Sequence, residues 1–200
     1  MTTKCVIFDV DWVLVNSWGK FSDRYQKEFG IPYEYLLEFF NWVFKECLVW
    51  DKDIKKELEP FIEKWKWNST VEELLLYWFE AENNVNFEML DIVRDLKEKW
   101  IICIYATDNE KCRTDYIKET MWFWEIFDEW FSSCFLHTKK SSPEYFALIL
   151  SILKSKYNIE PWEVMFFDDD EKNITSALTT WINAKIFTDF DTFISEIKNI

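Results

Sequence analysis

The chain has 200 residues, 49% of them hydrophobic, which is enough for one catalytic core with a modest insertion. Its net charge of −14 excludes the basic surface that nucleic-acid binding requires and argues against attachment to anionic membranes. The five scattered cysteines form no Cys-x-x-Cys pair, and the single histidine, His137, excludes a His-rich zinc site. We see no signal peptide and no apolar run of transmembrane length, so we expect a cytoplasmic protein with reduced thiols.

The first predicted element is a strand over residues 4–9, which leads into Asp9-Val10-Asp11. The run is short, apolar and β-branched, as expected for a strand buried on both faces. Ligands of open α/β sheets bind beyond the carboxyl ends of the strands, and a divalent cation is the usual partner of two neighbouring carboxylates there. An Asp-rich turn without function is the alternative interpretation.

Helical periodicity dominates the region that follows. Apolar residues at three- and four-residue spacing predict helices over residues 17–28, 33–47, 51–67 and 70–83. Ser69 followed by Glu72 resembles a capping box that opens the fourth helix. Aromatic residues crowd this all-helical insert, residues 17–85, and favour core packing of small helices over a stacking surface for a sugar or base. They are Phe39, Phe40, Trp42, Phe44, Trp65, Trp67, Tyr77, Trp78 and Phe79.

Helices and strands then alternate to the end of the chain. We predict helices over residues 87–99, 110–119, 143–154, 172–180 and 191–199, and strands over 101–106, 130–134, 163–167 and 184–187. This alternation is typical of the α/β class, in which helices cover both faces of a parallel sheet. We therefore expect a core formed by residues 1–16 and 86–200, with residues 17–85 as a helical cap.

Polar residues follow three of the predicted strands. Asp9 and Asp11 follow the first strand, Thr107-Asp108-Asn109 follows the strand over 101–106, and Asp168-Asp169 follows the strand over 163–167. A lysine, Lys140, precedes Ser-Ser-Pro-Glu and a helix, and Asn173 follows the paired acids. Each segment alone is a weak signal, but four in order make coincidence improbable.

These four segments resemble motifs I to IV of the haloacid-dehalogenase-like (HAD) superfamily, in the family's order and over nearly the whole chain. The resemblance implies a HAD-like (Rossmannoid) parallel sheet flanked by helices, with an all-helical cap inserted after the first strand. The overall pattern is most similar to small bacterial HAD phosphatases with helical caps.

The resemblance also implies a role for each motif residue. Asp9 would attack phosphorus and form an aspartyl-phosphate, and Asp11 would serve as general acid and then base. Thr107 would hydrogen-bond a phosphoryl oxygen. Lys140 would pair with the nucleophile and the phosphate, with Lys139 as the competing lysine.

The cofactor implied is Mg²⁺, held by Asp9, the backbone carbonyl of Asp11 and the pair Asp168-Asp169. We favour Asp169 as the direct ligand, with Asp168 either coordinating or supporting. Asp170 is expected in solvent or near a helix N-terminus, and Asn173 is expected to steady the acidic loop.

Two positions depart from the family's pattern. Asp108 stands where many relatives carry Asn; its backbone N–H can still bind phosphate, but its carboxylate would repel phosphate unless turned away. Asn109 can take over that place. Trp12 follows the second Asp, where the family usually has Gly.

We predict from this a Mg²⁺-dependent phosphomonoester hydrolase that acts on a small phosphorylated metabolite. A phosphomutase of the same fold shares every motif and remains an alternative, as does a non-catalytic HAD-like binding module. A haloacid dehalogenase fits less well, because those enzymes work without metal and lack the second Asp.

The balance of tryptophan and glycine is unusual, with 13 Trp beside 2 Gly. Glycine averages about 7% of residues, and several tryptophans here lie where glycine is expected, between helices and strands. We hypothesise that Trp12, Trp100, Trp122 and Trp181 are glycine in the natural protein, through a UGA codon read as Gly. A genuinely Trp-rich protein and deliberate substitution are the alternatives.

Overall fold

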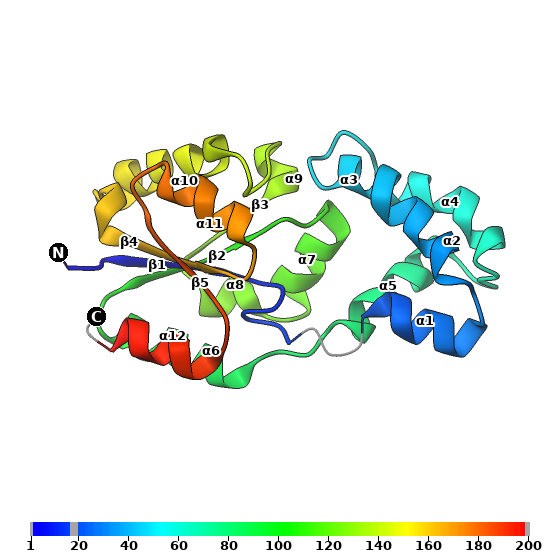
Figure 1. Cartoon of the computed structure of the whole chain (residues 1–200), viewed down its shortest axis with the longest axis horizontal. Coiled ribbons are helices and arrows are strands. Elements are labelled where there is room, and N and C mark those ends of the chain that lie inside the picture. Colours follow the sequence, from blue (N-terminus) through cyan, green and yellow to red (C-terminus); the bar gives the residue numbers. More distant parts are fainter. Residues whose placement is uncertain (1, 17–19, 199–200) are drawn as a thin grey trace.

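The computed structural model describes residues 2–16 and 20–198 and has a five-stranded sheet flanked by helices on the left in Figure 1. Its strand order is β3-β2-β1-β4-β5, and every neighbouring pair is parallel. The strands are β1 (Cys5–Asp9), β2 (Ile102–Thr107), β3 (Glu129–Ser132), β4 (Val164–Asp168) and β5 (Asn183–Ile186). The predicted α/β class with a parallel sheet is confirmed.

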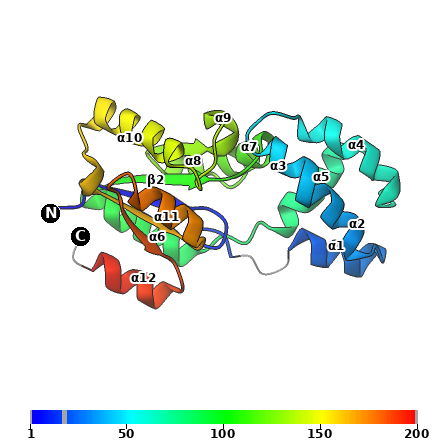
Figure 2. The same ribbon diagram turned by 45° about the horizontal axis from the view of Figure 1, so that its top comes forward.

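Side chains alternate between the two faces of the sheet, so that each strand feeds two hydrophobic clusters. From β1, Cys5 and Ile7 pack with α10 and α11, whereas Val6 and Phe8 pack with α6 and α12. Figure 2 shows α10 on one side of the sheet and α12 on the other. The helices of this part are α6 (Phe87–Glu98), α7 (Lys111–Glu119), α8 (Phe123–Ile126), α9 (Ser133–Leu136), α10 (Pro143–Tyr157), the 3₁₀ turn η2 (Pro161–Glu163), α11 (Glu171–Leu178) and α12 (Phe190–Ile197).

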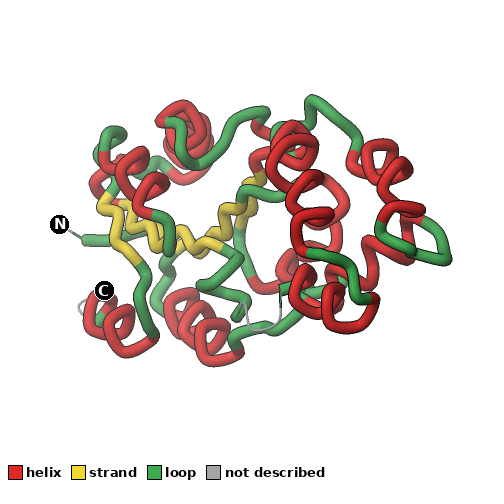
Figure 3. The backbone as a smooth tube through the Cα atoms, turned by 45° about the vertical axis from the view of Figure 1, so that its right-hand side comes forward, coloured by secondary structure: helices red, strands yellow, loops and turns green. Residues whose placement is uncertain are grey.

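A group of helices inserted between β1 and α6 lies beside the carboxyl ends of the strands (Figure 3). Its members are α1 (Phe21–Phe29), α2 (Tyr33–Glu38), the π-helical turn η1 (Phe39–Val43), α3 (Phe44–Cys47), α4 (Ile54–Lys64) and α5 (Val71–Ala81). The helix predicted over 33–47 is one continuous run with a π-helical turn inside it. The start of the helix predicted over 17–28 lies outside the described residues.

The predicted capping box at Ser69 is wrong by one residue. Thr70 is the N-cap of α5, and its side chain accepts a hydrogen bond from the Glu73 backbone N–H. Both Ser and Thr suit an N-cap. The cap is the residue with extended backbone immediately before the first helical turn, and here that residue is Thr70.

Aromatic side chains form the interior of the helical group, as predicted. Phe39 and Trp65 are fully buried and their rings meet edge to face at 5.6 Å. Phe21 stacks on Trp78 with ring centroids 5.2 Å apart. Such pairs add to the free energy gained from burying large apolar surfaces. Trp42 differs, because 76% of its surface is exposed.

Five tryptophans have left-handed backbone conformations. The φ angles are positive at Trp12, Trp50, Trp100, Trp122 and Trp181. This conformation brings Cβ close to the backbone and costs roughly 1–2 kcal/mol for a residue other than glycine. Four of these positions are the ones where the sequence indicated glycine, and Trp50 was not anticipated.

The thiols are unpaired, as expected, and the lone histidine lies at the end of a short helix. All five cysteines are free, and Cys5 and Cys103 are buried in β1 and β2. His137 follows α9, and its Nδ1 lies 3.1 Å from the carbonyl oxygen of Val49. Among residues 2–16 and 20–198, no helix is both long and apolar enough to cross a bilayer.

Candidate active site

Two carboxylates meet over one lysine where β1 and β4 end. The strands are neighbours in the sheet, so Asp9 and Asp168 emerge side by side. Lys140, just before α10, places Nζ 2.5 Å from Asp9 Oδ1 and 2.7 Å from Asp168 Oδ2. All three side chains are buried. Because buried charges require compensation, each of these groups depends on the other two.

Burial and the opposing charges set the ionisation of this cluster. Burial raises the pKa of the Asp9 carboxyl, and the Lys140 ammonium offsets only part of that rise. Burial lowers the pKa of Lys140, but Asp9, Asp168 and Asp108 raise it by more, so the net pKa lies well above its usual range. Lys140 is therefore a permanent cation at the floor of the site.

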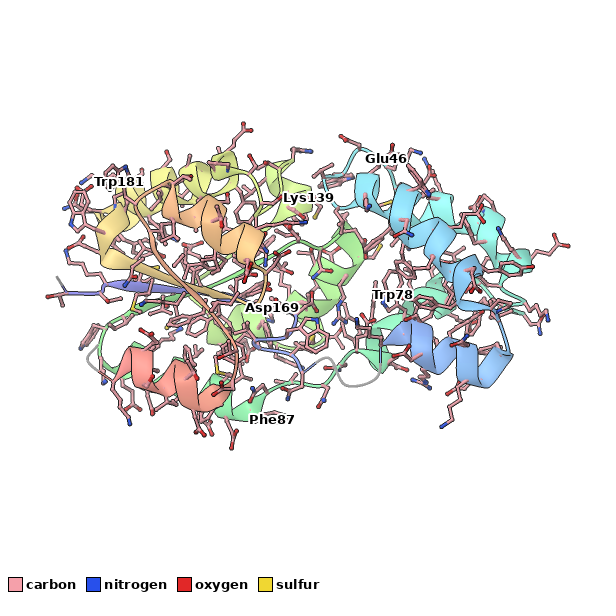
Figure 4. All side chains as sticks on the ribbon, viewed as in Figure 1. Glu46, Trp78, Phe87, Lys139, Asp169 and Trp181 are labelled. Carbon is pink, nitrogen blue, oxygen red and sulfur yellow. The ribbon has the colours of Figure 1, made fainter. Side chains whose placement is uncertain are left out.

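A third acid completes an oxygen-rich cluster. Asp9, Asp168 and Asp169 each offer a carboxylate oxygen, and these three oxygens lie within 4.8 Å of one another. Figure 4 shows Asp169 at the end of the sheet that faces the helical group. Burial and the neighbouring Asp168 raise the pKa of Asp169. Hard divalent cations prefer such oxygen ligands, so the residues present fit Mg²⁺.

Hydrogen bonds distinguish the two neighbouring acids, Asp168 and Asp169. Asp168 Oδ1 accepts from the Asp170 backbone N–H at 2.8 Å, and Asn173 Nδ2 lies 3.1 Å from each Asp168 oxygen. Asn173 thus steadies the acidic loop, as expected. Asp170 caps α11 through the Lys172 backbone N–H, which places it at a helix N-terminus. Asp168 is held by these bonds, and the exposed Asp169 is the freer ligand.

The segment after β2 orients Asp11. Asn109 Nδ2 donates to Asp11 Oδ2 at 2.8 Å and to Thr107 Oγ1 at 2.6 Å. Ser132 at the end of β3 donates to the Asn109 carbonyl oxygen at 2.9 Å, which fixes the loop. Residues from three strand ends therefore form one network around Asp11.

The carboxylate of Asp108 points to a backbone amide of the lysine loop. Its Oδ1 accepts a hydrogen bond from the Lys140 backbone N–H at 3.0 Å. Burial raises the pKa of this carboxyl, while Lys140 opposes the rise. The side chain thereby braces the loop that carries Lys140, and this is the turned-away arrangement that a phosphate site requires.

Solved structures provide the comparison that decides the fold. A HAD family enzyme from Bacteroides thetaiotaomicron superposes with a TM-score of 0.81 at 16% identity, covering 98% of each chain. A predicted HAD-like family hydrolase from Porphyromonas gingivalis superposes at 0.77 with 14% identity and 100% of each chain covered. The chain has the HAD-like fold. No protein-family model and no curated protein sequence matches it.

Two further similar structures are a phosphatase and a complex with magnesium and phosphate. A HAD phosphatase from Thermococcus onnurineus gives a TM-score of 0.64 at 17% identity, covering 93% of this chain and 86% of that one. The Bacteroides enzyme has also been solved in complex with magnesium and inorganic phosphate; that structure gives a TM-score of 0.73 at 18% identity and covers 96% of this chain and 98% of that one.

Within this HAD-like fold, all eight predicted site residues lie at the carboxyl edge of the sheet. They are Asp9, Asp11, Thr107, Asp108, Asn109, Lys140, Asp168 and Asp169. Lys140 and not Lys139 contacts the carboxylates. Figure 4 shows Lys139 near the helical group and away from Asp169.

Sequence reasoning missed Arg113, a buried arginine on α7. Its Nη2 lies 3.9 Å from Asp11 Oδ1, and its guanidinium donates to the carbonyl oxygens of Phe79 and Glu82 at 3.2 Å each. Arg113 thus joins the end of α5 to Asp11. No local signal marked it, because Asn109 precedes the N-cap of α7 and helical spacing does not relate the two residues.

Proposed function

We propose that this chain is a Mg²⁺-dependent phosphomonoester hydrolase acting on a small phosphorylated metabolite through an aspartyl-phosphate at Asp9. The buried triad of Asp9, Lys140 and Asp168, with Asp11 held nearby, carries the proposal. A nucleophilic carboxylate, a fixed cation and an oriented second carboxyl are the parts that phosphoryl transfer requires.

In the first step, an oxygen of Asp9 attacks phosphorus and the bond to the ester oxygen breaks. Oδ1 already accepts from Lys140 Nζ and from the Val10 backbone N–H at 2.7 Å, so Oδ2 is the attacking oxygen. The leaving alkoxide takes a proton from the carboxyl of Asp11. Asn109 and Arg113 hold Asp11 in a fixed orientation during this transfer.

In the second step, water attacks the aspartyl-phosphate. Asp11, now a carboxylate, accepts the proton of that water, inorganic phosphate leaves, and Asp9 is regenerated. Lys140 and the hydroxyl of Thr107 balance charge on the phosphoryl oxygens in both steps. When bound to Asp9, Asp169 and the backbone carbonyl of Asp11, Mg²⁺ would neutralise the phosphoryl charge.

We further propose that residues 17–85 are a cap that selects the substrate over a core of residues 1–16 and 86–200. A cavity of about 340 Å³ lies between this helical group and the start of α7. Three lysines and three acids from the two parts line it: Lys52, Lys55, Lys111, Asp53, Glu110 and Asp115. Its size and its charged lining suit a small polar metabolite.

The test is hydrolysis of p-nitrophenyl phosphate with Mg²⁺ and with EDTA. We expect turnover only with the metal, and a loss of at least about a thousandfold in Asp9→Asn. Asp170→Asn is the matched control, because Asn also caps a helix and this residue lies outside the catalytic network. The assay is repeated on a chain with glycine at residues 12, 100, 122 and 181, since Trp12 directly follows Asp11.

Trapping the intermediate separates the proposal from its alternatives. With p-nitrophenyl phosphate, whose leaving group needs no proton, Asp11→Asn slows only the second step, by about 10²- to 10⁴-fold, so phosphate accumulates on Asp9. Release of inorganic phosphate identifies a hydrolase, whereas return of phosphate to another hydroxyl of the substrate identifies a phosphomutase. A chain that binds phosphate without ever acquiring it covalently contradicts both and is a binding module.

A further inference from the structure

Tryptophan is concentrated in a backbone conformation that disfavours it. Among the described residues, eight residues other than glycine have positive φ, and five of these are Trp, with φ from 60° to 71°. Glycine adopts this region freely because it has no Cβ, and Asn and Asp are the usual exceptions. A bulky aromatic residue is an outlier at even one such position.

Hydrogen bonds show what two of these positions do. After α3, Trp50 N–H donates to the Cys47 carbonyl and Asp51 N–H to the Glu46 carbonyl, both at 3.1 Å. After α6, Trp100 N–H donates to Lys97 at 3.0 Å and Ile101 N–H to Leu96 at 3.1 Å. Both pairs are Schellman motifs, whose left-handed residue is usually glycine.

The other three positions are also turns. Trp181 follows α11 and donates its N–H to the Leu178 carbonyl at 3.2 Å. Trp122 is the residue before α8, and Trp12 lies in the turn after Asp11, where its N–H donates to the Val15 carbonyl at 2.8 Å. Main-chain bonds define each turn; among the side chains, the Trp50 ring meets Phe135 at 5.1 Å and the Trp12 ring lies under Lys20 at 5.4 Å.

Solvent exposure removes the usual reason to have tryptophan. The five side chains are 41% to 91% exposed, with Trp100 the most exposed. Figure 4 shows Trp181 at the end of the sheet opposite to Asp169. Burial of apolar surface, which could offset the backbone strain, is therefore largely absent.

Other tryptophans have the opposite character. Trp65 and Trp78 are buried in right-handed or helical conformations, and their indole N–H groups donate to the Tyr35 carbonyl and to Glu82 Oε2. Here the large ring and its polar group are both used. Trp65 and Trp78 thus differ from the five strained, exposed tryptophans in both backbone conformation and burial.

We propose that residues 12, 50, 100, 122 and 181 are glycine in the protein as its own cells make it. The codon at each position would be UGA, which differs from the glycine codon GGA in one base and which some codes translate as Trp. Trp65 and Trp78 would be encoded by UGG. This inference does not depend on the proposed function.

The codons give the first test. We expect UGA at all five positions and UGG at Trp65 and Trp78. UGG at the five positions overturns the proposal. The second test is peptide mass spectrometry of the protein from its own cells: glycine masses at the five positions are expected, and tryptophan masses there overturn the proposal whatever the codons are.

Unfolding provides an independent readout on recombinant protein. Replacing the five tryptophans by glycine should raise the midpoint of thermal unfolding, because the strained backbone no longer carries a Cβ. Trp42→Gly is the matched control: this side chain is as exposed, but it lies in the helical turn η1, so glycine there should lower the midpoint. A lower midpoint in the five-glycine chain contradicts the proposal.

Discussion

Lys140 compensates two buried carboxylates, and its removal should be costly. Lys140→Met leaves Asp9 and Asp168 facing each other without a cation. Removing one partner of a buried ion pair typically costs about 3–5 kcal/mol, so we expect a loss of that size in the free energy of unfolding in EDTA. Urea unfolding at neutral pH measures it.

Magnesium should partly restore this variant. A divalent cation bound by Asp9, Asp168 and Asp169 would replace the missing charge, so added Mg²⁺ should stabilise Lys140→Met more than the parent chain. The double variant Lys140→Met/Asp168→Asn carries less buried charge and should be destabilised less. An equal effect of Mg²⁺ on parent and variant would argue against a metal at these carboxylates.

Glu110 provides a prediction about pH. It is buried and caps α7, accepting hydrogen bonds from the Cys112 and Arg113 backbone N–H groups. Burial raises its pKa from 4.5 to about 7. Since the folded state binds the proton more tightly, this group's contribution to stability is complete below pH 4.5 and is lost as pH rises through 7, by about 3 kcal/mol.

The variant Glu110→Gln keeps an oxygen acceptor for the cap but cannot ionise. Its stability relative to the parent chain should therefore increase between pH 4.5 and pH 7.5, as followed by urea unfolding across that range. Parallel pH profiles for the two proteins would show that Glu110 does not titrate in this window.

For single residues, the sequence predicted the site residues that follow strands but missed a residue whose function depends on the tertiary fold. Asp9, Thr107 and Asp168 each end an apolar run, so their meeting follows from the parallel sheet alone. Arg113 lies on an ordinary helix, and its function depends on where the end of α5 comes to rest. That position is set by tertiary packing, which leaves no local pattern in the sequence.

Between elements, Arg113 links α7 to α5. Its guanidinium donates hydrogen bonds to two carbonyl oxygens at the end of α5 and lies 3.9 Å from Asp11. It therefore links the position of the helical group to that of the proposed general acid. We expect Arg113→Met to lower kcat for phosphate-ester hydrolysis about tenfold or more and to increase KM. Arg113→Lys keeps the charge but loses the fork of donors, and should recover only part of kcat.

A control on the same helix distinguishes positioning from general damage. Lys118 lies near the C-terminal end of α7 with Nζ 5.0 Å from the ring centroid of Trp130, and Lys118→Met should change kcat little. If Arg113→Met loses stability but retains kcat, the residue supports the fold and does not position Asp11.

Element boundaries were predicted unevenly, for physical reasons. The buried strands β1, β2 and β4 were predicted within a residue or so, because apolar β-branched runs have few other uses. The helix predicted over 51–67 is shorter, since Asp53 caps α4 and the chain turns left-handed at Lys66. The short helices α8 and α9 were not predicted, because four residues are too few to show a helical period.

One hydrophobic cluster joins the sheet to the helical group. It runs from Phe8 and Tyr105 on the sheet to Trp65 and Trp78 in the insert. The junction includes Phe79 of α5, whose ring lies 5.4 Å from that of Tyr116 on α7. Separating the two parts would expose the apolar side chains of the junction to water, and this exposure would cost free energy of folding.

This continuity predicts cooperative unfolding of the whole molecule. Urea transitions followed by tryptophan fluorescence, to which the buried Trp65 and Trp78 of the helical group contribute, and by far-ultraviolet circular dichroism should coincide. Tyr116→Ala removes the ring that Phe79 meets and should separate the transitions, with the fluorescence change at lower urea. Tyr33→Ala, at an exposed position in α2, is the control and should leave them coincident. Separate transitions in the parent chain would mean that the insert folds on its own, and that Arg113 and Tyr116 act only as a movable contact between the helical group and the rest of the chain.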